Sequence, residues 1–238
     1  MRYIILALAS VVVAACASQT QERADLIKVH GATGWLDTYV GQARVSYGSA
    51  ILLDSSTVLT AAHVVEGKPT DAKLYFILGA QNIPVEVIWE GKKDTLDVAV
   101  LRVKNADNKE SAGRKIFEIC DADSEVGRPV ALVTPTLSTS ALTIPRDREE
   151  YSDIETLVVD RITVGANGGH SGSGIFDIRT GCLAGIVSRK DGEDLKGGER
   201  NLLIERRLTK FAPASAIRKA LDNATSQART NSAQKPAG

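Results

Sequence analysis

The sequence has no net charge and few cysteines and histidines. Its lysines and arginines number 29 and its aspartates and glutamates also number 29, so no overall field favours nucleic acid, a polyanion or an anionic membrane surface as a partner. The three cysteines form no C-x-x-C pair, and the histidines are scattered without the spacing of metal ligands: His30, His63 and His170. We therefore expect no nucleic acid, no metal and no cofactor.

Long amphipathic helical patterns are also missing from most of the chain. From Thr33 to about Val187 the sequence consists of short apolar runs, rich in Val, Ile, Leu and Thr, that are separated by turn residues. Strands with no helices between them favour antiparallel all-β packing, as a sandwich or a barrel, over a parallel α/β sheet. No internal repeat and no second domain is evident.

The exception lies near the C-terminus, where FAPASAIRKALDNA predicts an α-helix. Pro213 stands at a tolerated start position, and Ile217, Ala220 and Leu221 share one face. Residues 223–238 contain nothing to bury, so we expect them to form a disordered tail.

The N-terminus carries an export signal. MRYIILALASVVVAAC begins with one cation and continues as an apolar run that is too short to remain as a membrane span. Its ending, VAAC, resembles the bacterial lipobox, which makes residues 1–16 a lipoprotein signal with a lipid on Cys16 and residues 17–29 a polar tether. An ordinary secretory signal cut at the small residues around Cys16 is the alternative. Both interpretations export the chain, and Ala17 after the cysteine favours an outer-membrane address facing the periplasm.

Two cysteines remain after the lipobox, Cys120 and Cys182. An exported protein enters a compartment that permits disulfides, so these two are candidates for a pair. The alternative, two free thiols, stays open because the sequence does not show how close their Cα atoms lie.

Three segments together contain the groups that acyl transfer by a serine requires: a hydroxyl, an imidazole, a carboxylate and backbone N–H donors. GSAILLDSSTVLTAAHVV predicts two strands joined by a tight turn and ending in small residues before His63. TLDVAVLRV puts Asp97 at the start of a buried strand. ANGGHSGSGIF places Ser171 among glycines, whose backbone freedom lets successive N–H groups point into one pocket.

These motifs resemble those of the chymotrypsin-like (trypsin-like) serine proteases. TAAHV, DVAVL and GHSGS match in order and spacing the family's histidine, aspartate and serine motifs. The serine loop is most similar to the glutamyl endopeptidases, and the hairpin is also similar to the high-temperature-requirement proteases. The resemblance covers about residues 30–222. It implies two antiparallel six-stranded β-barrels with a C-terminal α-helix, an active site in the cleft between the barrels and a linker near residues 105–115.

The resemblance also implies a role for each matched residue. Ser171 has glycine two residues before it and one after it, as the G-x-S-G pattern requires, so it is the implied nucleophile. His63 is the implied general base and Asp97 orients it. The backbone N–H groups of Gly169 and Ser171 would form the oxyanion hole. Ser173 is interpreted as structural.

Several alternatives compete with this assignment. Asp94 is a rival acid, but Thr-Leu follows it rather than the small apolar strand that follows Asp97. An α/β-hydrolase is excluded because its motifs run in the order serine, acid, histidine and because Ser173 stands where its elbow needs glycine. A catalytically silent protease-fold protein that binds peptides or a partner remains the alternative function.

Protein or peptide is the implied substrate, with a primary pocket lined by Ala166, Asn167 and Ser188. Glutamyl endopeptidases carry threonine in the loop that holds the first two, so glutamate specificity does not follow. Gly165 stands where trypsin-type enzymes carry an acid. Arg189 and Lys190 either favour a carboxylate or point to solvent.

His170 occupies the position where trypsin-type zymogens carry an acidic residue that pairs with a newly cut N-terminal amine. A histidine supplies no carboxylate for that amine. His170 is therefore a neighbour of the nucleophile rather than its base. We expect local bonds from the loop itself to hold the amides of Gly169 and Ser171.

Overall fold

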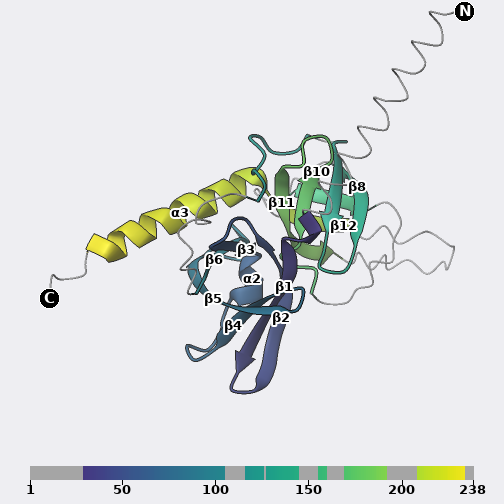
Figure 1. The fold of residues 1–238 in the computed structure, drawn as a ribbon. Helices are drawn as coiled ribbons and strands as arrows, with labels where there is room; N and C mark the ends of the chain where they lie inside the picture. The colour runs from purple at the N-terminus through teal and green to yellow at the C-terminus, as the bar shows by residue number, and fades with distance from the viewer. Residues whose placement is uncertain are drawn as a thin grey trace, which may run out of the picture.

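The computed structural model describes residues 29–104, 116–125, 127–144, 155–159, 169–191 and 208–233. Within these ranges the chain forms two closed antiparallel β-barrels and a long C-terminal helix (Figure 1). The predicted all-β architecture of two six-stranded barrels followed by a helix is confirmed. The signal, Cys16, the tether up to residue 28 and the proposed linker at 105–115 lie outside the described residues.

The first barrel has the strand order β1-β2-β3-β6-β5-β4. Its strands are β1 (Thr33–Val40), β2 (Ala43–Leu52), β3 (Thr57–Thr60), β4 (Lys73–Leu78), β5 (Gln81–Glu90) and β6 (Ala99–Val103). Alternate side chains on these strands point inward and fill the barrel with a core that includes Leu36, Val58, Phe76, Val85 and Leu101. Asp54 closes the turn between β2 and β3, because its carboxylate accepts the N–H of Ser56 and of Thr57, each at 2.8 Å.

The second barrel has the order β10-β11-β12-β9-β8-β7. Its strands are β7 (Pro129–Val133), β8 (Ser138–Ile144), β9 (Glu155–Val159), β10 (Gly174–Asp177), β11 (Leu183–Asp191) and β12 (Leu208–Pro213). Its interior is filled by Val130, Leu132, Ile175, Val187 and Phe211 among others.

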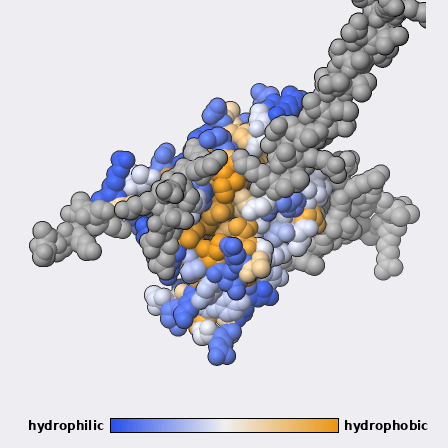
Figure 2. Space-filling model, in the orientation of Figure 1, coloured by the Kyte–Doolittle hydropathy of each residue, from blue (hydrophilic) through white to orange (hydrophobic). Residues whose placement is uncertain are grey.

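A third hydrophobic cluster joins the two barrels. It combines Ile51, Leu59 and Val100 of the first barrel with Phe176, Leu183 and Ile186 of the second. Side chains of the C-terminal helix belong to the same cluster, including Ile217 and Ala220. Figure 2 shows a hydrophobic band down the middle of one face of the molecule. The two barrels are therefore packed against each other through a shared hydrophobic cluster.

Helix α3 (Ala214–Ala233) corrects the predicted disordered tail. The helix continues through residues 223–233 and runs out from the barrels in Figure 1; residues 234–238 lie outside the described residues. Two features explain the extension. Ala224 is buried against the interface cluster, and adding residues to an existing helix costs little because nucleation has already occurred. In the described part of the chain, no helix combines the length and the apolar character needed to cross a bilayer.

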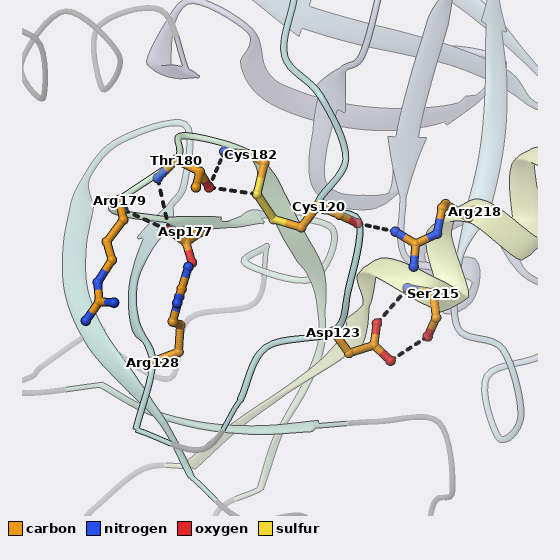
Figure 3. The surroundings of a disulfide bond; sticks show 9 residues. All are labelled: Cys120, Asp123, Arg128, Asp177, Arg179, Thr180, Cys182, Ser215 and Arg218. Carbon is orange, nitrogen blue, oxygen red and sulfur yellow. Dashed lines mark hydrogen bonds and ion pairs between the residues drawn. A yellow bond between two sulfur atoms is a disulfide. The ribbon is translucent and has the colours of Figure 1, made fainter.

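Residues 116–125 tie the second barrel to α3, as Figure 3 shows. The predicted disulfide is confirmed: Cys120 and Cys182 are bonded, with Cα atoms 5.1 Å apart. Asp123 accepts the N–H of Ser215 at 2.8 Å in the first turn of the helix, and Arg218 donates to the Cys120 carbonyl. The segment between the barrels is thus anchored to both a strand and a helix.

Candidate active site

His63 is held on a short helix that follows β3. This helix, α2 (Ala62–Val65), begins after Ala61, and the small side chains of both alanines are fully buried. Close packing continues across β2, because a Cβ on Gly48 would lie only 2.6 Å from a methyl group of Val64. The ring of His63 is thereby fixed at the barrel surface, with 23% of its side chain exposed.

The imidazole of His63 is paired with a buried carboxylate. Its Nδ1 lies 2.8 Å from Oδ2 of Asp97 and 3.1 Å from Oδ1. The backbone N–H of His63 also donates to Oδ1 at 3.0 Å. A carboxylate only accepts hydrogen bonds, so Nδ1 carries the proton and Nε2 is left as a base. Asp97 lies two residues before the buried strand β6, near the strand start where it was predicted.

The pKa of the Asp97 carboxyl lies below its usual value. Burial raises it, but the hydrogen bond and charge of His63 lower it, together with the hydroxyl of Ser188 and the backbone N–H of His63. Asp97 therefore remains ionised and a hydrogen-bond acceptor at neutral pH. Asp94, the rival acid, is exposed on the turn before it.

Ser171 lies in a tight glycine turn that precedes β10. Gly169 and Gly172 adopt φ values of +112° and +90°, a left-handed backbone that favours glycine. The hydroxyl of Ser171 donates to the backbone carbonyl of Ser188 at 3.2 Å. Among the described residues, it makes no hydrogen bond to His63. Ser173, interpreted as structural, is fully buried.

Ser188 connects the two halves of the site. Its hydroxyl donates to Oδ2 of Asp97, and its carbonyl accepts from Ser171, so one residue of β11 touches both. The sequence suggested Ser188 only as a lining residue of the substrate pocket and did not reveal the bond to Asp97. The structure thus brings His63, Asp97, Ser171 and Ser188 together at the junction of the barrels.

A second residue that sequence reasoning missed is Ser49. Ser49 lies on β2, and its backbone N–H donates to the carbonyl of Ser171 at 2.7 Å. Its hydroxyl donates to the carbonyl of Gly169 at 2.5 Å. The only local sign was a polar residue inside the hydrophobic run that follows Gly48.

The structure describes only some of the remaining predicted site residues. Ala166, Asn167 and Gly165 lie outside the described residues. For Arg189 and Lys190 only the backbone is described, and it pairs with β12. Within the described ranges, no three side chains of the metal-ligating types are grouped.

The comparisons with known proteins identify a family and a fold. Residues 48–186, more than half of the chain, match the family model of the trypsin-like peptidase domain. No curated protein sequence matches the chain. The active form of the Rv3671c protease from M. tuberculosis is similar in structure, with a TM-score of 0.62 and 17% identity over 83% of this chain and 82% of that chain.

Two further solved structures have similar folds. The serine endoprotease from Yersinia pestis has a TM-score of 0.60 and 14% identity over 85% of this chain and 66% of that chain. Deg5 has a TM-score of 0.56 and 15% identity over 84% of this chain and 92% of that chain. At these identities the likeness concerns the fold.

Proposed function

The chain belongs to the trypsin-like peptidase family, and on that basis we propose that it is a serine endopeptidase that cleaves protein or peptide substrates through an acyl-enzyme. The observation that carries the proposal is the bond of 2.8 Å between His63 Nδ1 and Asp97 Oδ2, which leaves Nε2 of a partly exposed imidazole as a base. The hydrogen bonds of Ser188 to both Asp97 and Ser171 support the proposal.

In the proposed mechanism, Oγ of Ser171 attacks the carbonyl carbon of the scissile bond while its proton passes to Nε2 of His63. Asp97 stabilises the imidazolium that forms. The N–H groups of Gly169 and Ser171 donate to the oxyanion. His63 then gives the proton to the leaving amine, and water releases the acyl group in the second half of the reaction.

The hydroxyl of Ser171 must leave the Ser188 carbonyl before it reaches His63. Rotation about the χ1 torsion of Ser171 would break this bond, and catalytic hydrogen bonds are commonly longer or misaligned without substrate. The same Ser171–Ser188 bond favours the second candidate, a catalytically silent peptide-binding protein, because a serine held there is not activated.

A fluorophosphonate probe distinguishes the two candidates. We expect the purified protein to be labelled, with Ser171→Ala unlabelled and inactive on casein, whereas the matched control Ser173→Ala keeps substantial labelling. A folded wild-type protein that takes no label would favour the silent candidate. Label found on Ser173 would overturn the assignment of the nucleophile.

The substrate pocket and the cellular address are separate parts of the proposal. Ala166, Asn167 and Ser188 are proposed to line the primary pocket, by resemblance alone. The VAAC sequence supports a lipid anchor on Cys16 and an outer-membrane address facing the periplasm. We expect a Cys16→Ser variant to leave the membrane fraction, and a variant that stays there would contradict the anchor.

A further inference from the structure

Ser49 makes two hydrogen bonds to the loop that contains Ser171, although the two lie in different barrels. Its hydroxyl donates to the Gly169 carbonyl at 2.5 Å, across 120 positions of sequence. Its backbone N–H donates to the Ser171 carbonyl at 2.7 Å. Ser49 itself is fully buried, so neither bond competes with bulk water. We call residues 169–172 the oxyanion loop.

The position of Ser49 is fixed within its own barrel. Thr60, also fully buried, donates its hydroxyl to the Ser49 carbonyl at 2.7 Å. Ser49 also pairs with Trp35 in the register of β1 and β2. The hydroxyl is therefore presented from a rigid strand rather than from a loop.

The oxyanion loop is pressed closely against this strand. A Cβ on Gly172 would lie 1.9 Å from the Ser49 carbonyl oxygen. A Cβ on Gly169 would lie 2.8 Å from the ring of Trp35 and 2.9 Å from the ring of Tyr47. A Cβ at either position would force a neighbouring group of the first barrel to move, so the loop follows the shape of that barrel.

Three consecutive carbonyls of the oxyanion loop are held in this way. The carbonyl of His170 accepts the N–H of Ser173 at 3.0 Å, within the loop's own turn. The carbonyls before and after it, those of Gly169 and Ser171, are both bonded to Ser49. The peptide that carries the Ser171 N–H is thus held by a local bond, as expected, and the two peptides on its C- and N-terminal sides are bonded to Ser49.

We infer that Ser49 is a positioning residue for the oxyanion hole. The peptide between His170 and Ser171 carries the Ser171 N–H, and a trans peptide points its N–H opposite to its carbonyl. With that carbonyl bonded to Ser173 and both neighbouring peptides bonded to Ser49, the N–H has one direction available. The bond to the Gly169 carbonyl likewise limits rotation about the backbone torsions of Gly169, which as a glycine would otherwise have wide conformational freedom. This inference rests on the proposed function of Ser171.

The test separates reactivity from binding. Ser49→Ala removes the hydroxyl bond and keeps the backbone bond. Loss of a direct oxyanion donor costs about 10²- to 10³-fold in rate, so for a residue acting through Gly169 we expect about a tenfold lower kinact for fluorophosphonate labelling, with an unchanged KI. Ser49→Thr, which keeps a hydroxyl, should restore most of kinact.

Thr33→Val is the matched control. Thr33 is a buried residue of β1 whose hydroxyl donates to the Val29 carbonyl at 2.9 Å, so its loss removes an equivalent bond away from the oxyanion loop. We expect wild-type labelling kinetics from this variant. Equal slowing of Ser49→Ala and Thr33→Val, an unchanged kinact in Ser49→Ala, or a change confined to KI would each overturn the inference.

Hydrogen exchange provides a readout that does not depend on catalysis. Amides of residues 169–173 should exchange faster in Ser49→Ala than in Thr33→Val or the wild type, and equal exchange rates would again overturn the inference. If the wild-type protein takes no label at all, the proposed function fails, and the exchange comparison still decides whether Ser49 holds the loop.

Discussion

Each barrel buries one aspartate whose pKa lies below its usual value, yet the two have different partners. Burial raises the pKa of both Asp97 and Asp177, and their hydrogen bonds lower it further than burial raises it. Asp177 pairs with Arg128 and accepts two backbone N–H groups of the turn that follows it. Asp97 instead pairs with a histidine that can exchange a proton, and with Ser188 from the other barrel.

The comparison shows that a lowered pKa does not by itself identify an active site. Both carboxylates are buried and ionised. What distinguishes Asp97 is that its partners span the two barrels and that one of them is a partly exposed histidine. Asp177 closes a turn within one barrel, and its arginine partner stays protonated at any ordinary pH.

The largest expected effect is on activity, from Asp97→Asn. The amide offers an N–H to the His63 ring and so favours the wrong tautomer, which costs about 10⁴-fold in kcat in triads of this kind. Initial rates of casein hydrolysis would measure the effect. Asp94→Asn, three residues away on the surface, should keep wild-type rates. A comparable loss in Asp94→Asn would contradict the assignment of the acid.

Asp177→Asn should show the opposite behaviour, with wild-type kcat per folded molecule and a free energy of unfolding lowered by about 2 kcal/mol through weakened charged hydrogen bonds. Because folding lowers the pKa of Asp177, its carboxylate stabilises the folded protein fully at pH values above the pKa of the unfolded chain, near 4. This stabilisation is lost as the pH falls through the pKa of the folded protein. The variant should therefore lose less stability on acidification than the wild type. Urea titrations at several pH values would measure this, and parallel pH profiles would contradict it.

The disulfide is expected to stabilise the second barrel and not the first. It joins cysteines 62 positions apart, and the loop-closure entropy of such a ring predicts a loss of about 4 kcal/mol in the free energy of unfolding when Cys120→Ser and Cys182→Ser are combined. Native-state hydrogen exchange should show the loss in β10 and β11 and much less in β1 and β2. Equal losses in both barrels would show that the barrels unfold as one unit.

Two glycines test how closely the barrels fit together. Gly41 in the first barrel has φ +60° with open space around it, whereas Gly172 has φ +90° and faces the Ser49 carbonyl. Alanine costs about 1–2 kcal/mol at either left-handed position. Gly172→Ala should cost at least about 2 kcal/mol more, because overpacking against backbone adds strain. Similar midpoints of thermal unfolding for the two variants would contradict the close fit.

The smallest expected effect concerns the helix that contacts both barrels. Ala224 is buried and Ala228 is exposed on the same helix, so replacing each by glycine removes one methyl group with a similar loss of helix propensity. Ala224→Gly should lower the free energy of unfolding by about 0.8 kcal/mol more than Ala228→Gly does, the value of one buried methylene. An equal cost would place the second half of the helix off the interface cluster.

The sequence predicted the parts of the fold that depend on local pattern. Short apolar runs indicated the strands, and the motifs around His63, Asp97 and Ser171 indicated residues that the fold then gathers at one junction. Each motif is contiguous, so its residues are placed by the strand, turn or helix that contains them. The cysteine pair was predicted from compartment and number, and the structure confirms it.

The contacts that the sequence did not reveal join distant positions. Ser49 and Gly169 are 120 positions apart, and the Ser188–Asp97 bond spans 91. The sequence around a serine in a strand does not indicate which carbonyl its hydroxyl will donate to, because that depends on how the two barrels pack. The extent of α3 was missed for a similar reason, since the burial of Ala224 depends on tertiary contacts.

The place of β12 in the second barrel has a consequence for biosynthesis. A chain is made from its N-terminus, and the strands of the first barrel are complete by Val103. The second barrel closes only when β12, residues 208–213, inserts between β11 and β9. Until then β11, which carries Ser188, is paired only with β10. A nascent chain that stops before β12 thus has His63 on a complete first barrel but an open second barrel, and we expect no peptidase activity until residues 208–213 are in place.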